Sequence, residues 1–290
     1  MNIFANRRSA ILTAVSFLAI LAMPASSRAQ SQAQVAPDPG KLRICASTVE
    51  SPYSLGDESG FENKIAKILA KEMGKEAVFV WSKRPAIYLV RDLLDKNECD
   101  VVMGLDTGDE RVLTTKPYYR SGYVFVTRQD RNLDLKGWDD PALRQLPKIA
   151  VGFSTPAEVM LKTIGRYDDD AVYLYSLVDF RSPRNQFVRV DPGRMVNEVA
   201  NGNADLAIAF APEVGRYVKA SSVPLRMTMI PDDATQANGE KVPQHFDQSI
   251  GVRKNDQALL AALDQALDKS RDSIEQVLDE EGIPTLPPQT

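Results

Sequence analysis

Apolar and polar positions along the chain follow two periods, one typical of strands and one typical of helices. From Phe61 to Met73, apolar residues recur at the spacing of one helix face, and Gly74 predicts the end of that helix. A second helical pattern starts at Pro85, a residue favoured in the first helical turn. Short apolar runs around these segments predict strands at residues 42–46, 77–81 and 100–105.

The same alternation continues after residue 120. One apolar run predicts a strand at residues 123–127 that crosses into a second lobe, and another predicts a strand at 248–253 after the return crossing. Thr155, Pro156 and Glu158 stand in the order of a capping box, which predicts a helix start. The other predicted elements are strands at 148–152 and 204–210, a helix at 194–199, a long helix from Leu259 to Leu278, and a weakly ordered Pro-rich tail at 284–290.

Strands and helices that alternate at this rate favour right-handed β-α-β units and mostly parallel sheets with flanking helices. We therefore predict an α/β protein of two lobes joined by two crossovers, with a cleft that closes by hinge motion. The predicted lobe 1 comprises residues 41–120 and 247–290, and lobe 2 comprises residues 121–246. A tether rich in Pro, Gln and Ala, residues 30–40, precedes them.

Residues 1–29 have the pattern of a secretory signal peptide. Arg7 and Arg8 precede an apolar run at residues 10–23, and the segment ends in Ser27-Arg28-Ala29 without any acidic residue. The run is about 14 residues long, shorter than the roughly 20 residues of a membrane-spanning helix. We therefore predict cleavage after Ala29, export to the periplasm and no stable membrane anchor. The general and the twin-arginine export routes both stay open.

The composition and the motifs of the chain limit the classes of partner and of reaction that we expect for it. Without residues 1–29 the chain has 32 basic and 39 acidic residues and a net charge of −7, which disfavours nucleic acid as a partner. The one histidine, His245, has no neighbouring cysteine or histidine with which to share a metal ion. The motifs GxSxG, HExxH, GxGxxG and GxxxxGK are absent from the sequence. We expect binding rather than catalysis, with no metal and no cofactor.

The two cysteines, Cys45 and Cys99, each belong to a strand-like run. Export to an oxidising compartment and an even count favour a disulfide between them. The alternative is a pair of buried free thiols. A catalytic thiol is disfavoured under either interpretation, because the chain has no CxxC spacing and no basic partner near either residue.

Over nearly all of its mature length the chain resembles the type II periplasmic solute-binding proteins. The resemblance rests on motifs in the right order: Ser51-Pro52-Tyr53, Gly60-Phe61-Glu62, and residues 99–104, 109–111, 116–119 and 202–206. Longer strings at residues 85–92, 114–125, 180–186, 224–227 and 231–233, with the paired cysteines, look like the methanol-oxidation subgroup, the MoxJ (MxaJ) proteins. This second resemblance implies a periplasmic accessory protein that supports assembly or activation of a PQQ-dependent methanol dehydrogenase, which would be its partner.

The resemblance also places residues at the cleft, namely Ser47, Asp106, Arg111, Thr155 and Phe210. In amino-acid receptors of this fold an Arg at the position of Arg111 binds the substrate carboxylate. Here Asp106 replaces a hydroxyl beside that site, and Phe210 replaces the acidic residue that takes the substrate ammonium. Pro156 stands in the turn where those receptors carry glycines. These departures disfavour amino-acid capture, and Arg111 has the alternative of pairing with Asp106 or Asp109.

The segment from Tyr173 to Arg189 mixes aromatic and arginine side chains, which are enriched at protein interfaces. We interpret it as a long loop with candidate partner-binding residues Tyr173, Tyr175, Phe180, Arg181, Arg184 and Arg189. The alternative is a solvated loop whose arginines pair with the acidic run 168–170. Two other functions stay open: a receptor that delivers a small organic solute to an ABC transporter, and an enzyme such as a dehydratase derived from the same fold.

Overall fold

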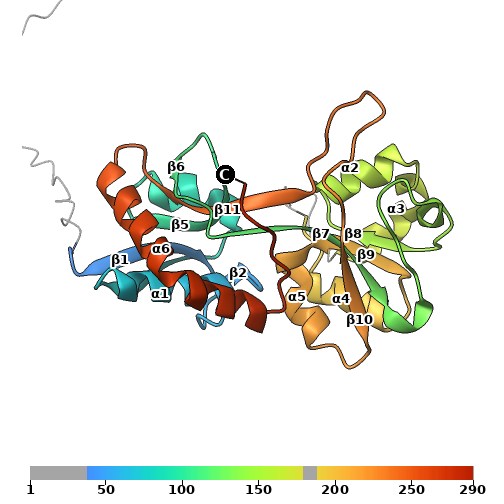
Figure 1. The fold of residues 1–290 in the computed structure, drawn as a ribbon, viewed down its shortest axis with the longest axis horizontal. Helices are drawn as coiled ribbons and strands as arrows, with labels where there is room; N and C mark the ends of the chain where they lie inside the picture. The colour runs from blue at the N-terminus through green and yellow to red at the C-terminus, as the bar shows by residue number, and fades with distance from the viewer. Residues whose placement is uncertain (1–37, 179–187, 290) are drawn as a thin grey trace, which may run out of the picture. The chain divides into compact units, whose positions relative to one another are not determined.

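The computed structural model describes residues 38–178 and 188–289, and within them the strands form one main sheet and one short ribbon (Figure 1). The order of the main path is β4-β1-β5-β11-β7-β9-β8. Its strands are β1 (Lys41–Ser47), β4 (Glu76–Ser82), β5 (Val101–Asp106), β7 (Tyr119–Arg128), β8 (Ile149–Val151), β9 (Leu206–Phe210) and β11 (His245–Val252). Beside this path β6 (Leu113–Thr114) pairs with β11 and β10 (Leu225–Met229) pairs with β7, while β2 (Val49–Glu50) and β3 (Ser54–Leu55) form the ribbon.

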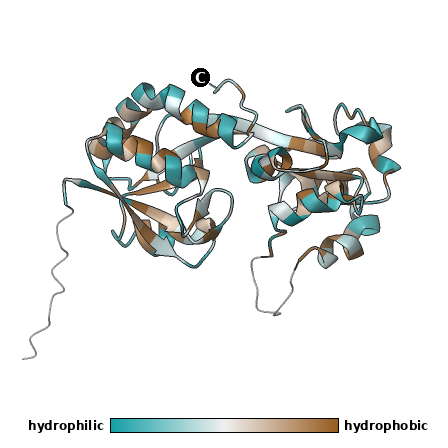
Figure 2. Ribbon diagram, turned by 90° about the horizontal axis from the view of Figure 1, so that it is seen from below, coloured by the Kyte–Doolittle hydropathy of each residue, from teal (hydrophilic) through white to brown (hydrophobic). Residues whose placement is uncertain are grey.

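The first lobe has the parallel pairings that the sequence predicts. Strand β1 runs parallel to both β4 and β5, and helices α1 (Phe61–Glu72) and α6 (Gln257–Glu280) pack beside them. The predicted face of α1 is buried, with Phe61 and Ile65 0% exposed, and Gly74 adopts a positive φ just after the helix. Hydrophilic and hydrophobic residues alternate along the helices (Figure 2). The segment after Pro85 is a 3₁₀ helix (Ala86–Tyr88) followed by a π-helical turn (Val90–Leu94).

The second lobe has its own core of parallel strands and helices. Strands β8 and β9 pair in parallel, and α2 (Pro156–Thr163), α3 (Tyr167–Ser176), α4 (Pro192–Ala200) and α5 (Ala211–Lys219) pack around them. Thr155 caps α2 by accepting from the Glu158 backbone N–H, as predicted. Glu158 reaches back one residue further than a capping box requires, to the Ser154 N–H. No helix within residues 38–178 and 188–289 is long and apolar enough to cross a membrane.

Two strands pass between the lobes, and both are antiparallel to their neighbours. Strand β11 pairs with β7 from His245–Gly122 to Gln248–Tyr119, and then with β5 from Gln248–Asp106 onward. The fit is tight at Gly122, since a Cβ there would lie 2.4 Å from Cδ2 of His245. The predicted fold class is therefore confirmed: each lobe contains parallel strands with flanking helices, and two antiparallel crossovers join them.

The C-terminal tail is more ordered than the sequence analysis predicts. The Leu286 N–H donates to the carbonyl of Arg120 at 2.8 Å, and the Ser121 hydroxyl donates to the carbonyl of Pro284 at 2.7 Å. Proline-rich composition indicated a loose end, but this tail satisfies backbone groups of crossover strand β7. Hydrogen bonds between the tail and a strand far away in the sequence leave no pattern in the residues of the tail itself.

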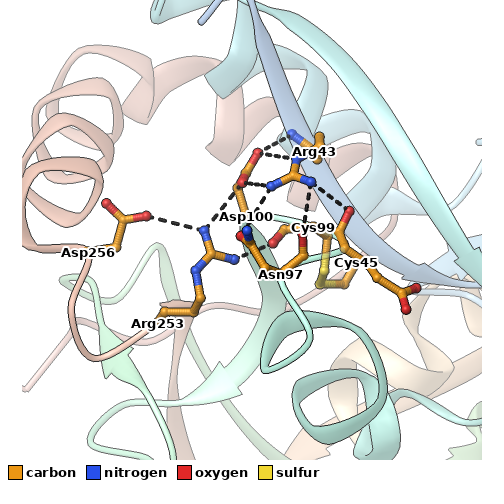
Figure 3. Close-up of a disulfide and its surroundings, with 8 residues drawn as sticks. Arg43, Cys45, Asn97, Cys99, Asp100, Arg253 and Asp256 are labelled. Carbon is orange, nitrogen blue, oxygen red and sulfur yellow. Dashed lines mark hydrogen bonds and ion pairs between the residues drawn. A yellow bond between two sulfur atoms is a disulfide. The ribbon is translucent and has the colours of Figure 1, made fainter. Parts of the chain in front are cut away.

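The disulfide between Cys45 and Cys99 is present and ties β1 to the start of β5 (Figure 3). The two Cα atoms are 5.4 Å apart, and Cys45 lies opposite Val102 in the parallel register. Both cysteines are at most 2% exposed. The predicted bridge is thus confirmed, and neither sulfur is available for chemistry.

A partly buried ionic cluster with Asp100 at its centre stands beside the disulfide. Asp100 accepts from Arg43, with Nη2 to Oδ1 at 2.6 Å, and from Arg253 at 3.4 Å (Figure 3). Burial raises the pKa of Asp100, but the hydrogen bonds from Arg43 outweigh that effect and hold its pKa below the ordinary range. The cluster therefore keeps its charges paired and links β1, β5 and the end of β11.

Replacing both cysteines with alanine is expected to lower the free energy of unfolding by about 4 kcal/mol, because the bridge closes a loop of 54 residues in the unfolded chain. Urea unfolding monitored by circular dichroism measures this change. A reductant should shift the midpoint of the wild type toward that of the double variant and leave the double variant unmoved. Equal midpoints for oxidised wild type and double variant would contradict the expectation.

Candidate functional site

A cavity of about 370 Å³ lies where the crossover strands meet the two lobes. Its lining includes the end of β5, the start of α1, the beginning of α5 and residues on both crossover strands. Four carboxylates line it, Glu50, Glu62, Asp106 and Glu213, together with four aromatic side chains, Tyr53, Tyr123, Phe210 and Phe246. A volume of this size is within the range of small-molecule sites.

Glu62 is the most buried of the four carboxylates, with 7% of the residue exposed. It occupies the second position of α1, where Gly104 on β5 makes room for it: a Cβ at Gly104 would lie 2.3 Å from Oε1 of Glu62. The hydroxyl of Tyr118 donates to that oxygen at 2.9 Å. Among the described residues, no group donates to the second oxygen, Oε2.

Burial raises the pKa of Glu62 to about 7, and Glu50 contributes in the same direction. The hydrogen bond from Tyr118 opposes the shift without cancelling it. No cation among the described residues pairs with Glu62. This carboxyl therefore changes its charge near neutral pH while facing a cavity.

Glu50 and Glu213 share a single cation, Arg189. One Arg189 nitrogen bonds to Glu50 and the other lies 3.6 Å from Oε1 of Glu213. Burial raises the pKa of Glu213, which Arg189 partly opposes and Glu50 reinforces. A single guanidinium between two carboxylates leaves this part of the cavity negative.

The aromatic side chains pack against one another on the second-lobe side. Tyr123 on β7 and Phe210 on β9 lie opposite each other in register, with ring centroids 5.7 Å apart. Phe246 on β11 meets the ring of Phe210 edge-on at 5.9 Å. Tyr53, in the loop between β2 and β3, belongs to the first-lobe side of the cavity and contacts Phe61.

The residues proposed for the cleft from sequence divide into two groups. Asp106 and Phe210 line the cavity, and Asp106 accepts from Nε2 of Gln248 at 2.7 Å. Ser47 faces a smaller neighbouring cavity and donates to the carbonyl of Arg84. Thr155 caps α2 beside the lining residue Pro156. Arg111 lies outside the cavity.

Arg111 is held on the surface by Asp109, the pairing that the sequence analysis left open as an alternative. Its Nη2 donates to Oδ2 of Asp109 at 2.6 Å, and its Nε contacts both carboxylate oxygens. The side chain is 47% exposed. A solute inside the cavity would therefore meet no guanidinium from this residue.

The residues proposed for partner binding are also separated by the structure. Residues up to Ser176 belong to helix α3, so the interpretation of 173–189 as one long loop is wrong at its start. The hydroxyl of Tyr173 contacts Glu198 at 3.3 Å, whereas Tyr175 is 58% exposed and packs on Phe153. Arg189 is not in the lining of the cavity but pairs with two residues that are, Glu50 and Glu213. Phe180, Arg181 and Arg184 lie outside the described residues.

The structure also places the acidic run 168–170 and the histidine His245. In the acidic run, Asp169 and Asp170 pair with Arg166 at 3.1 and 3.2 Å. They lie in the first turn of α3, where the helix dipole also stabilises negative charge. His245 begins β11, with its Nε2 2.8 Å from the carbonyl of Ile230. This histidine holds together two backbone segments of the second lobe.

Sequence reasoning missed Glu50, Glu62 and Glu213 as site residues. Glu62 was quoted only as part of the motif Gly60-Phe61-Glu62, and the glycine after Met103 was the one local sign that something must approach β5 closely. An acidic residue in the first turn of a helix is normally expected to lie in solvent. Its burial depends on a strand that follows much later in the chain.

Replacing Glu62 with Gln is expected to stabilise the protein at pH 8 by about 1–3 kcal/mol, because Gln resembles the protonated acid that burial prefers. A folded-state pKa raised to about 7 means that stability is fully present below the unfolded value of 4.5 and is lost as pH rises through 7. The gap between variant and wild type should therefore open across this window. Thermal or urea unfolding at pH 5 and pH 8 measures it, and a gap that is the same at both values would refute the assignment.

The comparisons with known proteins agree over both lobes. The profile of the bacterial extracellular solute-binding proteins, family 3, matches residues 42–278. Protein MoxJ of Methylorubrum extorquens is 55% identical over 281 residues, which cover 96% of this chain and 93% of that protein. Protein MoxJ of Paracoccus denitrificans is 48% identical, with 86% of this chain and 91% of that protein covered.

Solved structures give the same result. The crystal structure of MxaJ from Methlophaga aminisulfidivorans MPT superposes with a TM-score of 0.81 at 49% identity, and covers 85% of this chain and all of that one. The periplasmic binding protein XoxJ from Methylobacterium extorquens AM1 gives a TM-score of 0.61 at 30% identity, with 84% and 99% covered. From the family profile, the full-length relatives and these folds, the chain belongs to family 3 of the bacterial extracellular solute-binding proteins and, within it, to the MoxJ/MxaJ group.

Proposed function

We propose that the protein is a periplasmic accessory protein of methanol oxidation, which binds a PQQ-dependent methanol dehydrogenase and supports its assembly or activation. The observation that carries the proposal is the likeness to MoxJ at 55% identity through both lobes. The described residues of the cleft offer no free guanidinium to bind a solute carboxylate, which agrees with a role other than the delivery of solutes. Its role is then binding rather than catalysis.

The cleft gives little support to the rival role, a receptor that captures an amino acid for an ABC transporter. Arg111 is engaged by Asp109 outside the cavity, and Arg189 is engaged by Glu50 and Glu213. A substrate carboxylate entering this cavity would meet like charges at short range, which is unfavourable where water is excluded. A receptor of that kind needs a cation that this cavity does not offer among the described residues.

The compartment follows from the same proposal. Residues 1–29 would direct export and be removed after Ala29, which leaves a periplasmic protein without a stable anchor. The disulfide between Cys45 and Cys99 supports this placement, since such bonds persist in oxidising compartments.

The outer face of α3 is the surface that we assign to the dehydrogenase contact. Val172 is 85% exposed and Tyr175 is 58% exposed, and both side chains stand on this one helix. Exposed aromatic and aliphatic side chains of this kind act as anchors at protein interfaces. Tyr175 is held by Phe153, with ring centroids 5.2 Å apart, so its ring is already positioned.

The test is binding of the mature chain, residues 30–290, to purified PQQ methanol dehydrogenase by biolayer interferometry at low salt. We expect binding to the calcium-dependent enzyme, and we expect the double change Val172→Asp with Tyr175→Asp to weaken it about tenfold or more, because hot-spot anchors are each worth about 1–2 kcal/mol or more.

The matched control is Ile87→Asp, which places the same charge on a hydrophobic side chain that is 54% exposed in the first lobe. It should bind like the wild type. Equal loss in both variants would remove α3 as the contact face. Binding of neither the calcium-dependent nor the lanthanide-dependent dehydrogenase, with a small organic solute recovered from the denatured protein, would instead support the transporter receptor.

A further inference from the structure

We propose that a second interaction surface, on the first lobe, binds an acidic segment of a protein partner that carries an aliphatic or aromatic side chain at its centre. This surface, the Tyr88 surface, comprises Lys83, Arg84, Ile87, Tyr88 and Arg91. None of the five residues lines the cavity between the lobes. The inference does not rest on the proposed function, because the contact assigned to the dehydrogenase lies on α3 in the other lobe.

The backbone that carries the Tyr88 surface is irregular. A 3₁₀ helix, Ala86–Tyr88, passes into a π-helical turn, Val90–Leu94. Turns of the π type are rare and occur frequently at functional sites. Leu89 and Leu94 anchor the segment in the core, since both are at most 3% exposed, whereas Ile87 is 54% exposed. The segment therefore presents to solvent an aliphatic side chain that the fold does not bury.

Two arginines stack on the ring of Tyr88. The guanidinium carbon of Arg84 lies 3.9 Å from the ring centroid, and that of Arg91 lies 5.0 Å from it. Asp92 accepts from Nη1 of Arg84 at 2.6 Å and from Nε of Arg91 at 2.8 Å. The hydrogen bond from Arg91 holds the pKa of Asp92 below its ordinary range, so the carboxylate stays charged at neutral pH. Both guanidiniums are thus positioned in advance, which lowers the entropic cost of binding.

The same two arginines keep hydrogen-bond donors for a partner. The side chains of Arg84 and Arg91 are 51% and 63% exposed. Among the described residues, none accepts from Nη2 of Arg84 or from Nη1 and Nη2 of Arg91. Exposed ion pairs contribute little to stability, so the pairing with Asp92 does not by itself account for two ordered arginines. A planar guanidinium with N–H groups to spare binds a carboxylate through paired hydrogen bonds.

The charge of the segment favours an acidic partner. Residues 83–96 hold four basic and two acidic side chains, a net charge of +2 in a chain whose net charge is −4. Arg111 adjoins the segment by donating to the carbonyl of Ile87 at 3.4 Å, and Asp109 matches its charge. The positive balance therefore comes from the segment itself. It attracts an anionic surface and orients it on approach.

A protein segment fits the Tyr88 surface better than a lipid membrane does. Attachment to an anionic membrane requires a broad apolar face. Here one exposed aliphatic side chain, Ile87, stands beside the half-buried Tyr88. Protein interfaces typically place a few apolar or aromatic anchors among arginines, which is the composition of this surface.

The test titrates a short acidic peptide, with two glutamates on each side of a central Leu-Phe pair, into the isotope-labelled mature chain. Amide chemical shifts in nuclear magnetic resonance spectra report both affinity and location. The matched probe carries glutamine in place of each glutamate. We expect the acidic peptide to shift the amides of residues 83–92 and to bind about tenfold more tightly than its twin, because its hydrogen bonds are charge-assisted.

Salt gives a second readout of the same interaction. Raising sodium chloride from about 50 mM to about 300 mM should weaken binding of the acidic peptide, because the charges of the Tyr88 surface are exposed and screened. Equal affinity of the two peptides, or shifts confined to residues outside 83–92, would overturn the proposal.

Three variants assign the binding to named side chains. Arg84→Gln with Arg91→Gln should weaken binding of the acidic peptide about tenfold. Arg84→Lys with Arg91→Lys keeps both charges without the planar fork and should weaken it about threefold. Ile87→Asp leaves the pairs around Asp92 in place and should also weaken it about tenfold, so the test does not depend on a change that disturbs the turn.

The matched control is Arg131→Gln with Arg144→Gln, which removes two exposed arginines from the second lobe. It should bind the acidic peptide like the wild type. Thermal unfolding followed by circular dichroism checks that each variant is folded. Unchanged affinity in both the Arg84→Gln, Arg91→Gln variant and Ile87→Asp would refute the surface.

The lipid alternative and the dehydrogenase contact are measured separately. Cosedimentation with phosphatidylglycerol vesicles that is lost in Ile87→Asp, without binding of the acidic peptide, would overturn the proposal in favour of a membrane surface. Ile87→Asp has opposite expectations in the two protein assays, with peptide binding weakened and dehydrogenase binding kept. Absence of peptide binding would therefore overturn this inference and leave the contact on α3 unaffected.

Discussion

The antiparallel pairing of β7 with β11 is the interaction on which the rest of the structure depends. These two strands leave one lobe and enter the other, and their hydrogen bonds from Gly122–His245 to Gln248–Tyr119 join the strands of both lobes into one sheet. The pairing tolerates no side chain at Gly122, where the ring of His245 approaches. The cavity opens beside it, and three of its lining residues, Tyr123, Phe246 and Gln248, belong to these strands.

The ends of the lobe-1 strands are fixed by a different kind of bond. A disulfide and the paired charges of Arg43, Asp100 and Arg253 hold β1, β5 and β11 together away from the cavity (Figure 3). In this cluster the two arginines face two carboxylates, because Arg253 also pairs with Asp256 at 3.4 Å. In the cavity, by contrast, Glu62 is buried with a hydrogen bond from Tyr118, and no cation among the described residues pairs with it. The cluster stabilises the fold, whereas burial in the cavity raises the pKa of Glu62 to about 7.

The cavity is lined by acidic and aromatic side chains. Arg111 pairs with Asp109 outside the cavity, and Phe210 lines the cavity. Its negative charge comes from several elements, through Glu50, Glu62, Asp106 and Glu213.

The sequence by itself determined many of the elements and their order, but not α3, α5 or β10. The apolar faces of α1 and α6, the cap at Thr155, the stop at Gly74 and the pairing of two cysteines are local or near-local features, since each depends on periodicity, on a backbone conformation or on a count. The tertiary structure alone decided which carboxylates meet. Glu50, Glu62 and Glu213 come from a ribbon, a helix start and a helix in the other lobe, so their spacing carries no signal. Burial raises the pKa values of Glu62 and Glu213, and proximity lets Glu50 and Glu213 share Arg189. Both effects exist only once the crossover strands have brought the two lobes together.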